Sequence, residues 1–312
     1  MADAERTVRS QTRIHAEPKR TESPPRQKGL KRGGTALEQL SIPFDLTGWT
    51  DSRYVIPTML LQTAIFGVPL KKGVPRPRYM RELLAHENEV GFELHFTGQA
   101  LDQFDEDAYL GLIRNAKHRG LGARIPVTLR GLLRDMGLDS CGDLGTRLKA
   151  SFDRLFEAQI EITIKGKGKY KGHLVESIST DDALISDNYV FRLNPDMARL
   201  FAADSRTILE SSARQQLKYG PAKWLHTVIE ACVEDHIIIS MTTLWKRSGS
   251  QNKDVKDFRT KLNKALVELK NLKFVVSYRF EGDLVIIQRA PSSPNGSAKA
   301  VSSTEFLDGT AY

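Results

Sequence analysis

The chain has few cysteines and no long apolar run, and each absence excludes a class of protein. Only two of its 312 residues are cysteine, Cys141 and Cys232, and they lie far apart without metal-ligand spacing. A disulfide framework and a zinc site are therefore not expected, and the usage suits a reducing cytoplasm. No stretch approaches the roughly 20 apolar residues of a membrane helix. The N-terminal MADAERTVRSQ also lacks the apolar segment of a secretory signal.

The sequence also lacks the motifs of common enzymes. It contains no H-E-x-x-H, no G-x-S-x-G and no G-x-G-x-x-G after a strand-like run, and its histidines are scattered. One acidic run, Asp102, Asp105, Glu106 and Asp107, could attract a metal ion. It precedes an expected helix, however, where the helix dipole favours acidic residues. We therefore expect no catalytic site, no metal and no cofactor.

What the chain has is positive charge and two polar ends. Lys and Arg outnumber Asp and Glu by 46 to 38, which gives a net charge of +8 and favours a polyanionic partner. Residues 1–36 are rich in Arg, Lys, Ser, Pro and Gly and contain too few large apolar side chains to bury a core. We expect a disordered basic tail over residues 1–52 and a disordered C-terminal tail over 291–312.

Between these tails the chain repeats one order of elements. Apolar spacing predicts strands and helices, and Ser, Thr, Asp, Gly and Pro mark their ends. In the first copy the expected elements are strand 91–98, helix 105–120, strand 125–127, helix 128–137, helix 143–159, strands 160–165 and 173–180 joined by the turn GKGKYKG, strand 188–194 and a helix from Pro195. In the second they are helix 221–235, strand 237–240, helix 242–249, helix 252–272, and strands 273–280 and 283–290.

Helix, short strand, two further helices and a two-stranded ribbon are typical of a winged helix-turn-helix. The sequence therefore predicts an α+β fold with two tandem winged-helix domains, over residues 53–204 and 205–290.

Basic residues gather on the segments that a winged helix places against DNA. The last helix lies in the major groove, and its flanks and the ribbon contact phosphates. A charged helix face is equally typical of plain solvent exposure, so the segment Lys165–Lys171, with four lysines in seven positions and no acidic residue among them, is the more specific signal. The residues expected to contact DNA are Arg147, Lys149 and Arg154 on the first long helix, Lys165, Lys167, Lys169, Tyr170 and Lys171 in the turn, and Lys253, Lys256, Arg259, Lys261 and Lys264 on the second long helix.

Two stretches resemble one protein family. HFTGQALDQFDEDAYLGLIRNAKHRG and the following IPVTLRGLLRDMGL resemble the winged-helix region of plasmid replication initiators of the TrfA kind, and the resemblance continues through RLKASFDRLFEAQIEI and more weakly to about Arg289. Those initiators bind repeated sites (iterons) at a plasmid origin, open an adjacent AT-rich region and help recruit the host helicase and polymerase machinery. The resemblance implies a non-enzymatic initiator whose partner is double-stranded origin DNA, present as monomer, homodimer or both.

A short peptide in the N-terminal tail suggests another partner. Gln39, Leu40, Ile42 and Phe44, in QLSIPF, resemble the glutamine-led peptide by which bacterial proteins dock on the DNA polymerase sliding clamp. In TrfA-like initiators the two apolar residues of this peptide adjoin, whereas here Pro43 separates them. An extended peptide of this kind fills apolar pockets of its partner with a few anchors. The alternative is that Ile42 and Phe44 pack as a lead-in strand on the first domain.

Two other functions remain open from the sequence. A winged-helix transcriptional repressor would use the same DNA-binding face, but it would not explain QLSIPF. An origin-nicking or priming enzyme would need paired histidines, a nucleophilic tyrosine in context or clustered carboxylates, and none is visible in the sequence.

Replacing Ile42 and Phe44 together by Ala distinguishes a clamp peptide from a lead-in strand. If the peptide is exposed for a partner, clamp binding is abolished while the melting temperature hardly changes, because truncating exposed side chains alters stability by less than about 0.5 kcal/mol. If Phe44 is part of the core, its loss costs about 3–5 kcal/mol. A thermal melt of the double variant separates the two, and a large drop in melting temperature would contradict the clamp assignment.

Overall fold

The computed structural model describes residues 50–70, 73–139, 142–165, 168–180, 188–201 and 206–291. All of them belong to one compact unit, Gln39–Tyr312. The peptide at 39–44 and the predicted tails, apart from residues 50–52 and 291, lie outside the described residues.

The first part of the chain contains most of the strands. In order, its elements are β1 (Arg53–Pro57), α1 (Thr58–Leu61), β2 (Phe66–Gly67), β3 (Arg78–Ala85), α2 (Glu87–Val90), β4 (Glu93–Gln99), β5 (Leu101–Asp102), α3 (Gln103–Ala116), β6 (Ile125–Thr128), α4 (Leu129–Asp135), α5 (Gly142–Glu157), β7 (Gln159–Ile164), β8 (Gly168–His173), β9 (Val175–Thr180), β10 (Asn188–Leu193) and the 3-10 helix η1 (Pro195–Phe201). The helices and strands expected over 91–165 are confirmed, with shifted ends.

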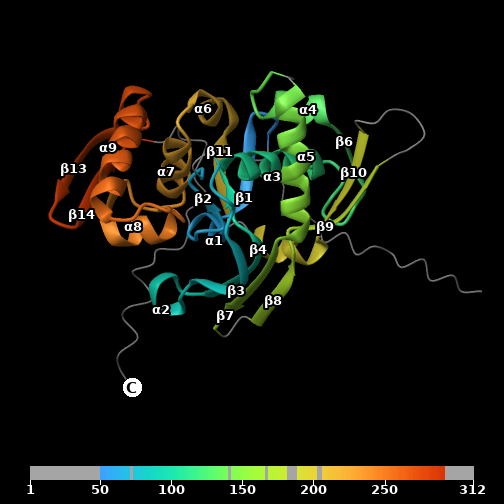
Figure 1. Cartoon of the computed structure of the whole chain (residues 1–312), viewed down its shortest axis with the longest axis horizontal. Helices are drawn as coiled ribbons and strands as arrows, with labels where there is room; N and C mark the ends of the chain where they lie inside the picture. Colours follow the sequence, from blue (N-terminus) through green and yellow to red (C-terminus); the bar gives the residue numbers. More distant parts are fainter. Residues whose placement is uncertain are drawn as a thin grey trace, which may run out of the picture. The chain divides into compact units, whose positions relative to one another are not determined.

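From α7 on, the later part follows the expected order of elements, and β11 and α6 before it were not expected. It comprises β11 (Arg206–Glu210), α6 (Ser211–Gln216), α7 (Gly220–Glu230), β12 (His236–Ser240), α8 (Met241–Arg247), α9 (Val255–Asn271), β13 (Val275–Glu281) and β14 (Leu284–Arg289). Strands β12, β14 and β13 form one antiparallel sheet, with β14 in the centre. Figure 1 shows this sheet in orange to red, with α9 beside it and α7 and α8 next to α9.

Among the described residues, three other antiparallel sheets organise the first part of the chain. Strand order is β3-β4-β7-β8 in the largest and β6-β10-β9 in the second, while β1 pairs with β11. On β4, alternate side chains such as Leu94 and Phe96 are buried and their neighbours face outward. The four-stranded sheet therefore has one apolar face on the core and one polar outer face. Strand β11 lies in the stretch expected to connect two domains, and its Leu209 pairs with Tyr54 of β1.

The structure confirms a strand within 173–180, β9, but corrects its pairing. Gly168–His173 is itself a strand, β8, paired with β7, and β9 pairs with β10 instead. Lys169, Tyr170 and Lys171 therefore lie on a strand and not on a glycine-rich tip. Two smaller differences concern helices: α8 begins at Met241 with Ser240 as its cap, one residue before the expected start, and the segment from Pro195 is a 3-10 helix.

The described residues form two hydrophobic clusters. The larger contains side chains of β1, β4, α3, α4, α5, β7 and β10, and the other contains side chains of α7, α8, α9, β12, β13 and β14. In the second, Phe258, Leu262 and Leu266 share the buried face of α9, at the helical spacing that predicted this helix.

The start of α3 carries a buried group of charges. Asp102 caps the helix by accepting the Phe104 N–H, and Asp105 accepts the Asp102 N–H in return. The expected position of the acidic run at a helix N-terminus is thus confirmed. Its burial was not expected: Asp105 and Glu106 are 0% and 1% exposed.

Cations from distant segments compensate these carboxylates. Arg154 of α5 donates from Nη2 to Asp105 at 2.6 Å, and Ser151 donates to the same oxygen at 2.6 Å. Arg76 donates to Asp102 at 2.6 Å. The other two acidic residues are also paired: Lys223 Nζ lies 2.6 Å from Asp107, Arg214 Nε donates to Asp107, and Arg214 Nη1 lies 3.4 Å from Glu106. These ion pairs join α3 to α5, to the segment before β3, to α6 and to α7.

The pKa of Glu106 makes this network sensitive to pH. Burial raises that pKa from 4.5 to about 7, although Arg214 lowers it. The folded protein therefore binds this proton more tightly than the unfolded chain does. As a result, Glu106 lowers the free energy of unfolding progressively as pH rises from about 4.5 to about 7.

Replacing Glu106 by Gln removes this dependence. The free energy of unfolding of the variant minus that of the unchanged protein should increase by about 3 kcal/mol between pH 4.5 and 7 and stay constant above. His226, whose pKa burial lowers to about 3, titrates in the opposite sense in both proteins, so only this difference isolates Glu106. Urea unfolding across that range measures it. A difference that does not change with pH would contradict the assignment.

Candidate nucleic-acid interface

Helix α9 presents the expected basic face. Asp254 caps it by accepting the Asp257 N–H at 2.8 Å, and the buried apolar side chains fix the opposite face on the core. Lys256 and Arg259 are exposed, and the Arg259 guanidinium lies 4.6 Å from the centre of the Phe280 ring of β13. This cation–π contact orients Arg259 while its charge remains exposed. Helix and ribbon thus present one continuous surface here.

The other three residues predicted to contact DNA from α9 and the residues before it differ in exposure and in their contacts. Lys253 is exposed just before α9. Lys261 is half-buried and donates to Asn252 Oδ1 at 2.7 Å, which draws it away from the outer face. The Lys264 ammonium lies 4.6 Å from the Tyr219 ring, in a second cation–π contact. Lys256 and Arg259 are therefore the best placed of the five.

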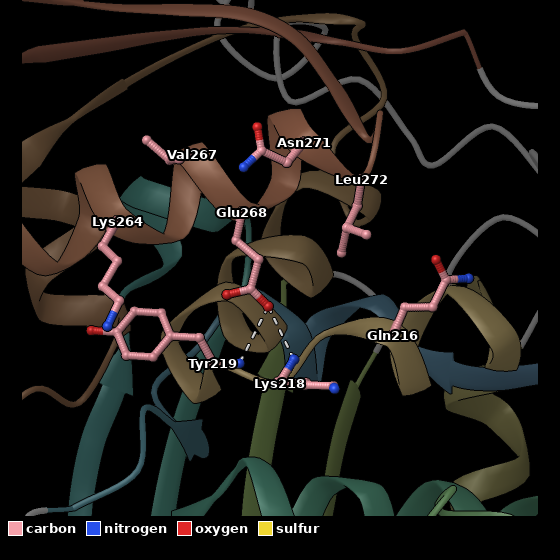
Figure 2. A pocket seen from close by; sticks show the side chains of 8 residues that line it. All are labelled: Gln216, Lys218, Tyr219, Lys264, Val267, Glu268, Asn271 and Leu272. Carbon is pink, nitrogen blue, oxygen red and sulfur yellow. Dashed lines mark hydrogen bonds between the residues drawn. The ribbon is translucent and has the colours of Figure 1, made fainter.

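A groove lies beside the C-terminal half of α9. Figure 2 shows its lining, Gln216, Lys218, Tyr219, Lys264, Val267, Glu268, Asn271 and Leu272, around a volume of about 600 Å³. The Glu268 carboxylate accepts the backbone N–H groups of Lys218 and Tyr219 at 3.0 and 3.3 Å. This contact ties the chain between α6 and α7 to α9, so Lys218 and Lys264 lie at the rim of one surface.

Of the three residues predicted to contact DNA from α5, two lie at the surface and one is buried. Arg147 is exposed, with its guanidinium 4.0 Å from the centre of the Phe104 ring, and Lys149 is exposed. Arg154 is 8% exposed and bound to Asp105, so the structure contradicts its assignment as a DNA contact. Arg154 has the helical spacing that places it on the same side of α5 as Arg147. Spacing alone, however, does not show that α3 covers Arg154.

The lysines of the ribbon β7–β8 have an acidic partner, which lies on β7 and outside the sequence of the turn. Glu161 of β7 faces β8, and Lys169 Nζ lies 2.6 Å and Lys171 Nζ 3.7 Å from its carboxylate. Hydrogen bonds from Arg81 and Lys169 lower the pKa of Glu161 to about 2, so it is ionised at neutral pH. The expectation of four lysines without an acidic partner is therefore wrong, although Lys169 and Lys171 remain more than half exposed.

The remaining ribbon residues have different positions. Lys165 is 86% exposed, with Glu87 at 3.8 Å, and Lys167 lies outside the described residues. Tyr170 points to the other face of β8, where it packs against the larger hydrophobic cluster. Burial raises its pKa, and its buried hydroxyl has no hydrogen-bond partner among the residues that the structure describes. Tyr170 therefore anchors the ribbon and does not offer a ring for stacking on bases.

One residue of this surface was missed in the sequence. Arg81 of β3 donates to Glu161 at 2.9 Å and lies beside the two ribbon lysines. No local signal could have found it, because β3 is separated from β7 by β4 in the sheet and by about eighty positions in the chain.

Within the described part of the chain, no group of three or more His, Cys, Asp or Glu side chains is placed to hold a metal ion. None of the helices described there is long and apolar enough to cross a bilayer.

Replacing Arg154 by Ala tests its assignment to the interior. The change leaves the buried Asp105 without its main cation, and losing one partner of a buried pair costs about 3–5 kcal/mol. Arg147→Ala on the same helix is the matched control and should cost less than about 1 kcal/mol, since Arg147 is exposed. Urea unfolding measures both. Equal, small losses would return Arg154 to the set of surface residues.

Comparisons with known proteins place the chain in a family. A crystal structure of RctB domains 2–3 is similar at 12% identity, covering 75% of this chain and 97% of that one, with a TM-score of 0.49. The Pi initiator protein in complex with iteron DNA is similar at 13% identity, covering 61% and 94%, with a TM-score of 0.44. A search of curated proteins finds no match.

The family comparison covers most of the chain. The model of the TrfA protein family matches residues 28–289, which include every described helix and strand. This confirms the resemblance drawn from HFTGQALDQFDEDAYLGLIRNAKHRG and the segments after it. The chain belongs to the TrfA protein family.

Proposed function

We propose that this protein initiates plasmid replication by binding repeated sequences in the plasmid origin. The observation that carries the proposal is the family match over residues 28–289. The exposed Lys256 and Arg259 on α9 support it, because a helix with one face on the core and a basic outer face suits insertion into the major groove.

The proposed mode of binding is that of two winged helices. In the second, α7, α8 and α9 are the three helices and β13 and β14 the wing. In the first, α3, α4 and α5 have these roles, with β7 and β8 as the wing. Domain limits of 53–204 and 205–290 belong to this proposal. Its support is the repeated order of three helices followed by a β-ribbon, with basic side chains on the third helix each time.

Beyond DNA, the proposed partners are host replication proteins. We infer that the bound protein opens an adjacent AT-rich region and helps to recruit the helicase. Gln39, Leu40, Ile42 and Phe44 are proposed to bind the sliding clamp. The protein would act in the cytoplasm as a DNA-binding protein and not as an enzyme, with monomers and homodimers both present.

Selection from a pool of randomised duplexes tests sequence-specific binding. The unchanged protein should enrich one motif. Lys256→Ala or Arg259→Ala should cost on the order of 1–3 kcal/mol of discrimination if the side chain reads a base. Replacing Lys167, Lys169 and Lys171 together should instead weaken binding to all duplexes and flatten its salt dependence. No enrichment by the unchanged protein would contradict the proposal.

A replication assay distinguishes an initiator from a repressor. A plasmid that carries this gene and its flanking DNA as the only origin should be maintained, and the Lys256→Ala, Arg259→Ala double variant should lose it. Arg119→Ala, which removes an exposed charge just after α3, is the control. A protein that binds the flanking DNA and represses transcription without maintaining the plasmid would support the repressor.

A further inference from the structure

Arg81 has a strained backbone. Its φ of 54° lies in the left-handed region that residues other than glycine rarely adopt. The register between β3 and β4 shifts between Tyr79 and Glu82, so Arg81 lies within a β-bulge. Its backbone N–H donates to Thr97 Oγ1 at 3.0 Å, which holds the strained conformation in place. Strain of this kind is frequent at functional sites, and bulges commonly re-aim a side chain.

The bulge aims the Arg81 side chain across the polar face of the sheet. Its guanidinium passes over β4 and reaches Glu161 of β7, with Nη2 2.9 Å from Oε1. Lys169 and Lys171 approach the same carboxylate from β8. Two strands, β3 and β8, thus bring three cations to one acidic side chain of β7.

These cations remain available to solvent. The side chains of Arg81, Lys169 and Lys171 are 62%, 54% and 56% exposed, whereas that of Glu161 is 8% exposed. The carboxylate is therefore largely shielded from solvent, while the three cationic side chains remain more than half exposed. Glu93, 3.2 Å from His95, adds a second carboxylate to this face, and the three cations still exceed the two acids.

A small polar cavity opens beside the three cations. Its volume is about 140 Å³, and Arg81, His95, Thr97, Gln159, Glu161 and Lys171 line it. Hydroxyl, amide, ammonium and guanidinium groups in this lining can all donate hydrogen bonds. An arginine fork can bond a carboxylate with one N–H and an anionic oxygen with the others.

We propose that Arg81, together with Lys169 and Lys171, binds a single backbone phosphate of duplex DNA at this cavity. The proposal rests on the proposed DNA-binding function and adds to it a residue from β3. Glu161 is a positioning residue, which holds the three cations at one point. The bulge is the means by which β3 contributes a cation to a surface otherwise formed by the ribbon.

The test compares Arg81→Ala, Arg81→Gly and the control Arg119→Ala. The probe is a labelled random-sequence duplex of about 30 base pairs, with binding measured by fluorescence anisotropy over a range of KCl concentrations. Loss of one phosphate contact makes the negative slope of log affinity against log salt shallower by about 0.9 and weakens binding to all sequences alike. We expect this for both Arg81 variants and no change for Arg119→Ala. An unchanged slope and affinity in both Arg81 variants would overturn the proposal.

Arg81→Gly separates binding from folding. Glycine adopts a φ of 54° without strain, so this variant should melt at least as high as Arg81→Ala while it loses the same DNA contact. If Arg81→Gly melts as high as the unchanged protein and yet binds DNA more weakly, misfolding cannot explain the loss of binding.

Phosphate ethylation interference locates the contact. Ethylation of one phosphate should impair binding by the unchanged protein and have no further effect on Arg81→Gly. A separate experiment adds inorganic phosphate as a competitor of the duplex at constant ionic strength. If phosphate competes much more strongly than chloride, the site binds free phosphate, and the assignment to the DNA backbone is overturned. If the unchanged protein does not bind duplexes at all, the proposed function fails; if it binds and selects a motif while the Arg81 variants behave like it, only this inference fails.

Discussion

Four carboxylates at the start of α3 are buried, and the arrangement of the surrounding segments depends on their neutralisation. Arg154 comes from α5, Arg214 from α6 and Lys223 from α7, so each ion pair is also a contact between segments far apart in the chain. Burying an acidic group without its cation is costly, whereas a complete pair is tolerated. These segments must therefore come together as a set. Because the ion pairs fix α5 against α3, they also fix where the surfaces of α5 and of the following ribbon lie.

The features that sequence could predict are local. Thr128 caps α4 by accepting the Gly131 N–H, as expected from a threonine before an apolar helical pattern. The apolar stripe Phe258, Leu262 and Leu266 predicted both the existence of α9 and its buried face. These signals lie within a few residues of each other. They allowed the later part of the chain, and the basic side of α9, to be predicted well.

The features that sequence could not predict depend on pairing between distant segments. Arg154 has the spacing of a surface residue, but α3 covers it, and nothing in the α5 sequence reports this. A run of glycine and lysine is typical of a turn, yet Lys169 and Lys171 extend a strand because β7 offers a row of hydrogen-bonding groups. Arg81 joins them only because the sheet places β3 and β7 on either side of β4.

The order of the four-stranded sheet leaves β3 and β8 as its two edges. An edge strand exposes unpaired backbone groups that can pair with another chain, and proteins commonly prevent this with bulges or with charged side chains. Here β3 is interrupted by the bulge at Arg81 and β8 carries Lys169 and Lys171. The same devices that gather positive charge therefore also oppose edge-to-edge aggregation. The residues of the proposed phosphate contact are therefore also the ones that protect the two edges of this sheet.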